Sequence, residues 1–144
     1  PQSTTVEKID QRVNLVEKSN KLLLLKEILN QDNAKSILVF SKTKHGANRV
    51  VKYLTENQIG AAAIHGNKSQ SAREKALEDF RKGKNTVLVF LKKATRRIIN
   101  SRLSLGKFLF TIHKLFTVYK GEINRENMEK YYQVFHGAKE GVLW

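Results

Sequence analysis

The sequence predicts an α/β fold in which parallel strands alternate with helices. Short, wholly apolar runs, such as SILVF at 36–40 and TVLVF at 86–90, are typical of strands buried in a parallel sheet. The segments between such runs carry apolar residues at helical spacing. Strands that alternate with helices of about 10 to 15 residues indicate βαβ units, whose crossovers we expect to be right-handed.

The first part of the chain predicts four parallel strands and three helices. The strands are expected at 9–16, 36–40, 60–64 and 86–90. The helices are expected from Ser19 or Asn20 to about Gln31, after a turn at 43–46, and at 69–82. The buried layer of the sheet is expected to hold Leu38, Phe40, Ile64, Val87 and Val89, with Leu54, Leu77 and Phe80 packed on it.

The helix expected at 69–82 carries the clearest boundary signals. Ser71 and Glu74 have the spacing of a capping box, which places the helix start at 69–71. Gly83 is expected to cap its C-terminus. A strand therefore leads through a glycine turn into a helix N-terminus. Such turns bind anions, because backbone N–H groups and the helix dipole point out of the sheet edge.

Two turns of this kind are expected, at 41–44 and 65–69, each at the carboxyl end of a parallel strand. Two anion-binding turns indicate an extended phosphate backbone rather than one small phosphate. The candidate binding residues are Lys42, Thr43, Gly66, Lys68 and Arg73. The alternative, which stays open, is a pair of ordinary strand-to-helix connections with solvated Lys and Arg side chains.

The charge distribution also favours a polyanionic partner. The net charge is +14, from 27 basic and 13 acidic residues. No acidic residue occurs between Asp79 and Glu122, whereas basic residues recur throughout that interval. A block of one sign most often binds nucleic acid, although a solvated basic surface without a specific partner is the other interpretation.

Several kinds of site are absent from the sequence. There are no cysteines, and the four histidines lie far apart, so we expect no metal site and no disulfide. We find neither a GxxxxGK[ST] phosphate loop nor a complete set of catalytic residues. No apolar run is long enough to span a membrane and no signal peptide opens the chain, so a cytoplasmic location is expected.

The segments ILVFSKTKHGANRVVKYL and IGAAAIHGNKSQSAREKALEDFRKGKNTVLV resemble the second RecA-like lobe of DEAD-box RNA helicases, especially bacterial cold-shock and ribosome-assembly types. The resemblance covers about residues 6–89. The family's motif IV corresponds to 38–43, and a following motif with Gln and Arg three apart corresponds to Gln70 and Arg73. In the family these segments hold the sugar-phosphate backbone of single-stranded RNA. The resemblance implies a parallel sheet with helices on both faces.

The resemblance also implies that ATP and Mg²⁺ belong to a first lobe, with its own phosphate loop, that is missing here. After TVLV the family continues with a segment like ATDIAARGID and later HRIGRTGR, whereas this chain has FLKKATRRIIN at 90–100 and nothing like the second motif. The arginine finger expected in that motif is therefore absent. A family-like part joined to a basic tail suggests a frameshift, a truncated pseudogene or a recombined fragment; a diverged protein is the other interpretation.

We therefore expect a partial helicase C-terminal domain at 1–90 and a basic, irregular part at 91–144. In the second part, 108–119 is expected to form one or two strands and 124–135 a helix, followed by a tail. Alone, the chain should bind no ATP productively and unwind nothing. It should bind RNA weakly and without sequence preference. Two alternatives remain open: an inert fragment whose charge is its only binding property, and a protein-interaction module.

Overall fold

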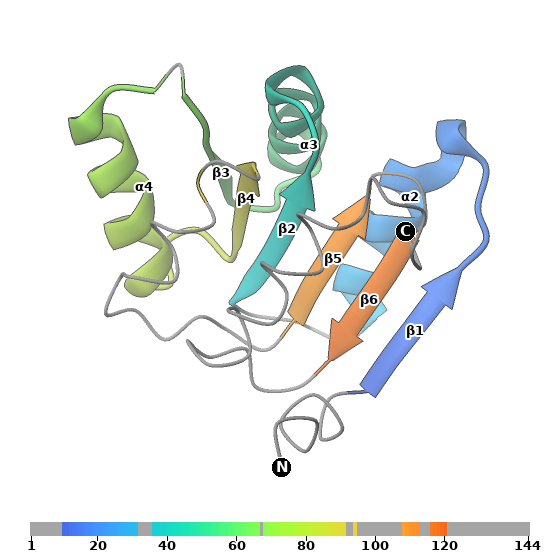
Figure 1. Ribbon diagram of the computed structural model, residues 1–144. Coiled ribbons are helices and arrows are strands. Elements are labelled where there is room, and N and C mark those ends of the chain that lie inside the picture. Colours follow the sequence, from blue (N-terminus) through green and yellow to red (C-terminus); the bar gives the residue numbers. More distant parts are fainter. Residues whose placement is uncertain are drawn as a thin grey trace, which may run out of the picture.

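The computed structural model describes residues 10–31, 36–66, 68–91, 94, 108–112 and 116–120 (Figure 1). Its strands form a six-stranded sheet in the order β1-β6-β5-β2-β4-β3. The strands are β1 Asp10–Asn14, β2 Ile37–Ser41, β3 Ala61–Ile64, β4 Val87–Leu91, β5 Phe108–Ile112 and β6 Phe116–Lys120. The helices are the 3-10 helix η1 Lys18–Asn20 and the α-helices α2 Lys21–Gln31, α3 Lys44–Glu56 and α4 Gln70–Arg81.

The centre of the sheet is parallel, as expected. β2 pairs in parallel with both β4 and β5, and β3 pairs in parallel with β4. The strands expected at 36–40, 60–64 and 86–90 are each found within one residue of their predicted bounds. The sequence therefore predicts both the position and the direction of the strands that precede the candidate site.

The first strand differs from the expected all-parallel arrangement. β1 lies at the edge of the sheet and pairs antiparallel with β6, which itself pairs antiparallel with β5. β5 and β6 follow one another closely in the sequence, and strands joined by a short connection can only pair antiparallel. β6 therefore takes the place beside β5, and β1 is left with the outer position.

Helices cover both faces of the sheet. Leu25 and Leu29 of α2 and Leu54 of α3 are buried in one core cluster with Val39 and Val89 of the sheet. Because side chains alternate along a strand, Leu38, Phe40, Ile64, Leu88 and Phe90 face the opposite side, where α4 buries Ala76 and Phe80. The residues expected in one buried layer are all buried except the half-buried Leu77, but they divide between two faces. In Figure 1, α2 and α3 lie behind the sheet.

The helix boundaries follow from local capping. Thr43 caps α3, and Ser69 caps α4 by accepting a hydrogen bond from the backbone N–H of Ala72 at 3.1 Å. The predicted start of α4 is confirmed, but Ser71 lies inside the helix, so the capping box expected from its spacing with Glu74 is wrong.

Gly83 ends α4, as expected. Its φ is +78°, its N–H donates to the Phe80 carbonyl at 3.1 Å, and the N–H of Lys84 donates to the Asp79 carbonyl at 2.9 Å. These two bonds form a Schellman motif, which requires the left-handed backbone that glycine adopts without strain.

The segment expected to form one or two strands at 108–119 forms two, β5 and β6. Both belong to the same sheet as β2, so part of the sequence after residue 90 continues the α/β domain. The helix expected at 124–135 and the tail after it lie outside the described residues.

Candidate nucleic-acid interface

The two predicted turns lie at the same edge of the sheet. Phe40 of β2 and Ile64 of β3 both stand opposite Phe90 of β4, so β2 and β3 end level with one another. β2 and β3 lie on either side of β4 and do not pair with each other. Neighbouring strands are about 4.8 Å apart, which separates the turns by roughly 10 Å.

The turn from β2 into α3 is held by two side-chain hydroxyls. The Oγ of the buried Ser41 donates to the Thr43 carbonyl at 3.3 Å, and Thr43 Oγ1 accepts from the N–H of Gly46 at 2.9 Å. A Cβ on Gly46 would lie 2.7 Å from Ser41 Oγ, so any larger residue here would force the Ser41 hydroxyl to move. The N–H groups of Lys44 and His45, at the start of the helix, have no intrahelical acceptor and remain available to an anion.

The turn from β3 into α4 brings the predicted Gln70 and Arg73 together. Arg73 Nη2 donates to Gln70 Oε1 at 3.0 Å, and Arg73 Nη1 donates to the Lys68 carbonyl. Gln70 Nε2 in turn donates to Glu74 Oε1 at 3.0 Å. The guanidinium of Arg73 is thus folded back onto its own turn. Gly66, Lys68 and Gln70 are exposed, and Arg73 is half-buried.

His65 links the second turn to α3. Its Nε2 lies 3.0 Å from Oδ1 of Asn48 in α3, and its side chain is 5 % exposed. Burial, and then the charges of Lys68 and Lys44, hold the pKa of His65 below its ordinary value of 6.5. The imidazole is therefore neutral at pH 7, and its hydrogen bond links α3 to the turn that carries Lys68.

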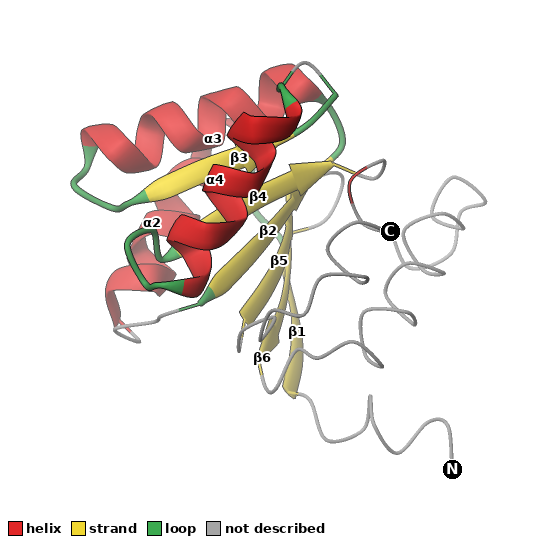
Figure 2. Cartoon of the chain, turned by 90° about the vertical axis from the view of Figure 1, so that its left-hand side faces the viewer, coloured by secondary structure: helices red, strands yellow, loops and turns green. Residues whose placement is uncertain are grey.

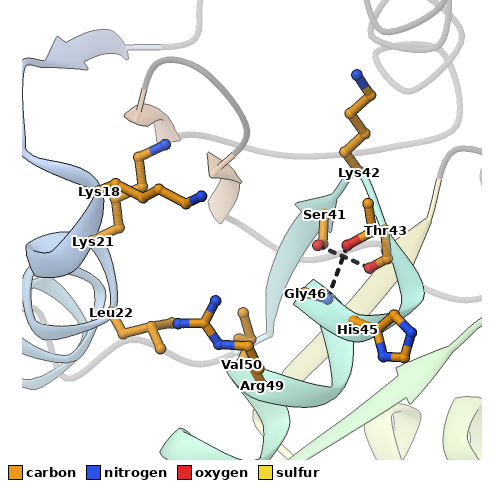
Figure 3. Close-up of a pocket in the computed structure, with 10 residues that line it drawn as sticks. All are labelled: Lys18, Lys21, Leu22, Ser41, Lys42, Thr43, His45, Gly46, Arg49 and Val50. Carbon is orange, nitrogen blue, oxygen red and sulfur yellow. Dashed lines mark hydrogen bonds between the residues drawn. The ribbon is translucent and has the colours of Figure 1, made fainter.

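A basic cavity extends the first turn toward α2 (Figure 3). It has a volume of about 310 Å³ and lies between the start of α2 and the turn from β2 into α3. The described residues of its lining include Lys18, Lys21, Lys42, His45 and Arg49 and no carboxylate. Burial and the nearby charge of Lys18 lower the pKa of Lys21. In Figure 3, Arg49 extends from α3 toward α2.

Lys18, Lys21 and Arg49 were missed by reasoning from the sequence. The three-residue spacing of Lys18 and Lys21 could place them on one helix face, but α2 packs beside α3 only in the folded chain. The predicted residues thus fall into two groups, Lys42 and Thr43 at one turn and the other four at the second. The bond from His65 to Asn48 links the second turn to α3, the helix that follows the first turn.

The described part of the chain contains neither a metal-binding cluster nor a membrane-spanning helix. No three or more His, Asp or Glu side chains there come close enough to hold a metal ion. No helix in that part is long and apolar enough to cross a membrane.

Comparisons with known proteins match this architecture. The family described as helicase conserved C-terminal domain matches residues 20–133. The DEAD-box ATP-dependent RNA helicase 40 of Oryza sativa subsp. japonica is 45 % identical over 89 residues, which are 61 % of this chain and 11 % of that protein. The ATP-dependent RNA helicase DBP2 of Vanderwaltozyma polyspora is 40 % identical over 82 residues, 57 % of this chain and 19 % of that protein. The chain therefore spans less than a fifth of these relatives.

Solved structures show the same fold. The Escherichia coli DEAD-box protein SrmB, bound to the regulator of ribonuclease activity A, matches with a TM-score of 0.60 and 23 % identity over 67 % of this chain and 55 % of that one. Saccharomyces cerevisiae Dbp5 bound to RNA and ADP BeF3 matches with a TM-score of 0.60 and 20 % identity, over 69 % of this chain and 25 % of that one. At these identities the matches establish the fold alone.

The family match covers residues 20–133, which is most of the chain. This chain belongs to the family of helicase conserved C-terminal domains.

Proposed function

We propose that this domain binds the sugar-phosphate backbone of single-stranded RNA, without sequence preference. The observation that carries the proposal is the pair of helix N-termini, α3 and α4, that begin at one sheet edge and are flanked by basic side chains. The RNA-binding residues are Lys42, Thr43, Gly66, Lys68, Gln70 and Arg73. The names of the relatives, which are RNA helicases, and the RNA-bound Dbp5 structure support the choice of RNA.

The physical basis is the electrostatics of the two turns. The free N–H groups of a helix N-terminus and its dipole attract a phosphate, and nearby cations add to the field. Because the turns are separated by roughly 10 Å, one strand of RNA can contact both through different phosphates. The basic cavity at Lys18, Lys21 and Arg49 continues the same field beyond the first turn. Contacts of this kind position a strand but read no base.

The affinity should be low for two reasons. A single lobe contacts the strand from one side. In the free domain Arg73 also bonds the Lys68 carbonyl and Gln70, so a phosphate has to compete with these internal bonds. We therefore expect micromolar or weaker binding.

We further propose that the chain alone does not hydrolyse ATP. The sequence has no phosphate loop, residues 90–100 depart from the family segment like ATDIAARGID, and nothing resembles the later HRIGRTGR motif in which the finger arginine is expected. The family match extends to residue 133, and β5 and β6 both lie between residue 90 and residue 133. The departure of 90–100 from the family sequence therefore affects a catalytic motif more than the sheet. The bacterial type and the cytoplasmic location stay proposals; the two curated relatives come from a plant and a yeast.

The test is fluorescence anisotropy with a labelled oligouridylate of about ten nucleotides. Arg73→Ala should weaken binding by about 1 kcal/mol more than Arg81→Ala, which removes the same charge at the other end of α4. Thermal unfolding of both variants shows whether either domain has lost its fold. Equal weakening by the two changes would mean that the chain binds RNA only as a polycation.

A further inference from the structure

The outer edge of β3 is unpaired within the described part of the sheet. β3 stands last in the strand order, with β4 on its inner side. The Gly60 carbonyl accepts from the N–H groups of Thr86 and Val87, both at 3.1 Å, so the backbone of Gly60 points toward β4. Backbone groups alternate along a strand, and those of Ala61 and Ala63 therefore point away from β4. This edge presents N–H and C=O groups in the pattern that another strand would bind.

The edge lies in a groove rather than on an open surface. A cavity of about 560 Å³ runs along β3 and is walled by α3 on one side and α4 on the other. Figures 1 and 2 both place β3 between these two helices. The floor consists of Ala61–Ala63, whose side chains are small, so the groove comes close to the backbone of the strand.

The walls of this groove are basic. Lys52 lines it from α3, and Lys68 and Lys75 line it from the α4 side. The carboxylate in the lining, Asp79, lies 3.2 Å from Lys75 Nζ and is already paired. Among the described residues of the groove, no carboxylate pairs with Lys52 or Lys68, which line it from α3 and from the α4 side. An extended chain that carries carboxylates would match this charge.

We propose that the groove binds an extended, acidic peptide segment of a protein partner, which adds to β3 as a further strand. Main-chain hydrogen bonds to Ala61 and Ala63 provide the pairing, as in other cases of strand addition to a sheet edge. Alternate side chains of the peptide face the two walls, where carboxylates meet Lys52 and Lys68. The length of β3 limits the paired segment to about four residues. Lys68 lines this groove and is also one of the proposed RNA-binding residues, whereas Lys52 lines the groove and is not one of them.

The experiment uses the full chain and a fluorescein-labelled peptide of about eight residues with alternating Glu and Val. Amide NMR should show slower hydrogen exchange at Ala61 and Ala63 when the peptide is added. A peptide of the same sequence with N-methylated backbone on its pairing face should lose binding, because strand pairing needs those N–H groups. Lys52→Glu should weaken binding at least about fivefold, and Lys84→Glu, the same charge change outside the groove, less than about twofold.

Four outcomes would overturn the proposal. If the N-methylated peptide binds as well as the parent, the peptide does not add as a strand. If Lys84→Glu weakens binding as much as Lys52→Glu, only net charge matters. If the oligouridylate protects the Ala61 and Ala63 amides and displaces the peptide, the groove is part of the RNA site. If these amides become protected as the chain concentration rises without peptide, a second copy of the chain covers the edge.

Discussion

Phe80 should anchor α4 to the sheet, and its removal tests the packing of this face. α4 buries two residues, Ala76 and Phe80, so a single large side chain holds the helix against the strands. Phe80 is 4 % exposed. A buried Phe removes about 150 Å² or more from water, which at about 25 cal/mol per Å² corresponds to roughly 4 kcal/mol. Phe80→Ala should therefore cost about 3–5 kcal/mol, a large share of the 5–15 kcal/mol that stabilises an ordinary domain.

Urea unfolding monitored by circular dichroism measures this cost. The urea concentration at the midpoint of unfolding should fall, while the slope of the unfolding free energy against urea concentration stays the same. The reason is that the substitution alters stability rather than the surface area exposed on unfolding. Leu23→Ala is the matched control, because Leu23 is 48 % exposed and its truncation should change stability by less than about 0.5 kcal/mol. A Phe80→Ala domain that unfolds at the same urea concentration as the parent would refute the docking of α4 described above.

The remaining predictions concern ATP, salt, one glycine and pH. Phosphate release from ATP should not exceed that of a heat-treated control, with or without RNA; clear RNA-stimulated release would contradict the proposal. A plot of log affinity for single-stranded RNA against log salt should have a slope of about −3 to −4, as for four to six neutralised phosphates, and a slope near zero would exclude backbone binding. Gly46→Ala should cost about 1–3 kcal/mol by pressing on Ser41, whereas Gly66→Ala, which has open space around it, should cost less; equal midpoints would disprove the close approach. The pKa of His65 is lower in the folded chain than in the unfolded chain, so as the pH falls the unfolded chain binds a proton first. The stability that comes from neutral His65 is therefore complete above about pH 6.5 and is lost as the pH falls below that value. His65→Gln should remove that dependence in unfolding curves taken across pH 5 to 7, and an unchanged pH profile would assign it to other groups.

The sequence predicts the elements that depend on local signals. Apolar runs locate β2, β3 and β4 within one residue, and Gly83 marks the end of α4 because a left-handed residue is required there. The start of α4 is also found, although through Ser69 rather than the capping box expected at Ser71. In each case the residues that decide the boundary lie within one helical turn of it.

Features that depend on packing between distant segments could not be predicted in this way. The basic cavity joins Lys21 of α2 to Arg49 of α3, which approach only because both helices pack on one face. The core residues were identified, but their division between two faces follows from strand register and not from hydrophobicity. β1 is antiparallel because it pairs with β6, which lies more than a hundred residues later in the sequence. The assignment of RNA contacts to the six predicted residues stays a prediction.

The pairing of β1 with β6 determines how the domain responds to tension. Asp10 stands opposite Lys120, and Asn14 stands opposite Phe116, so the chain enters and leaves this ladder at the same end. A pulling force applied at residues 10 and 120 would open the ladder one residue pair at a time, as a zipper, instead of shearing all five pairs together. The outer strands would detach at low force, before the parallel strands that position the two turns. A single-molecule pulling experiment from these two positions should therefore show an early, small extension that precedes rupture of the core.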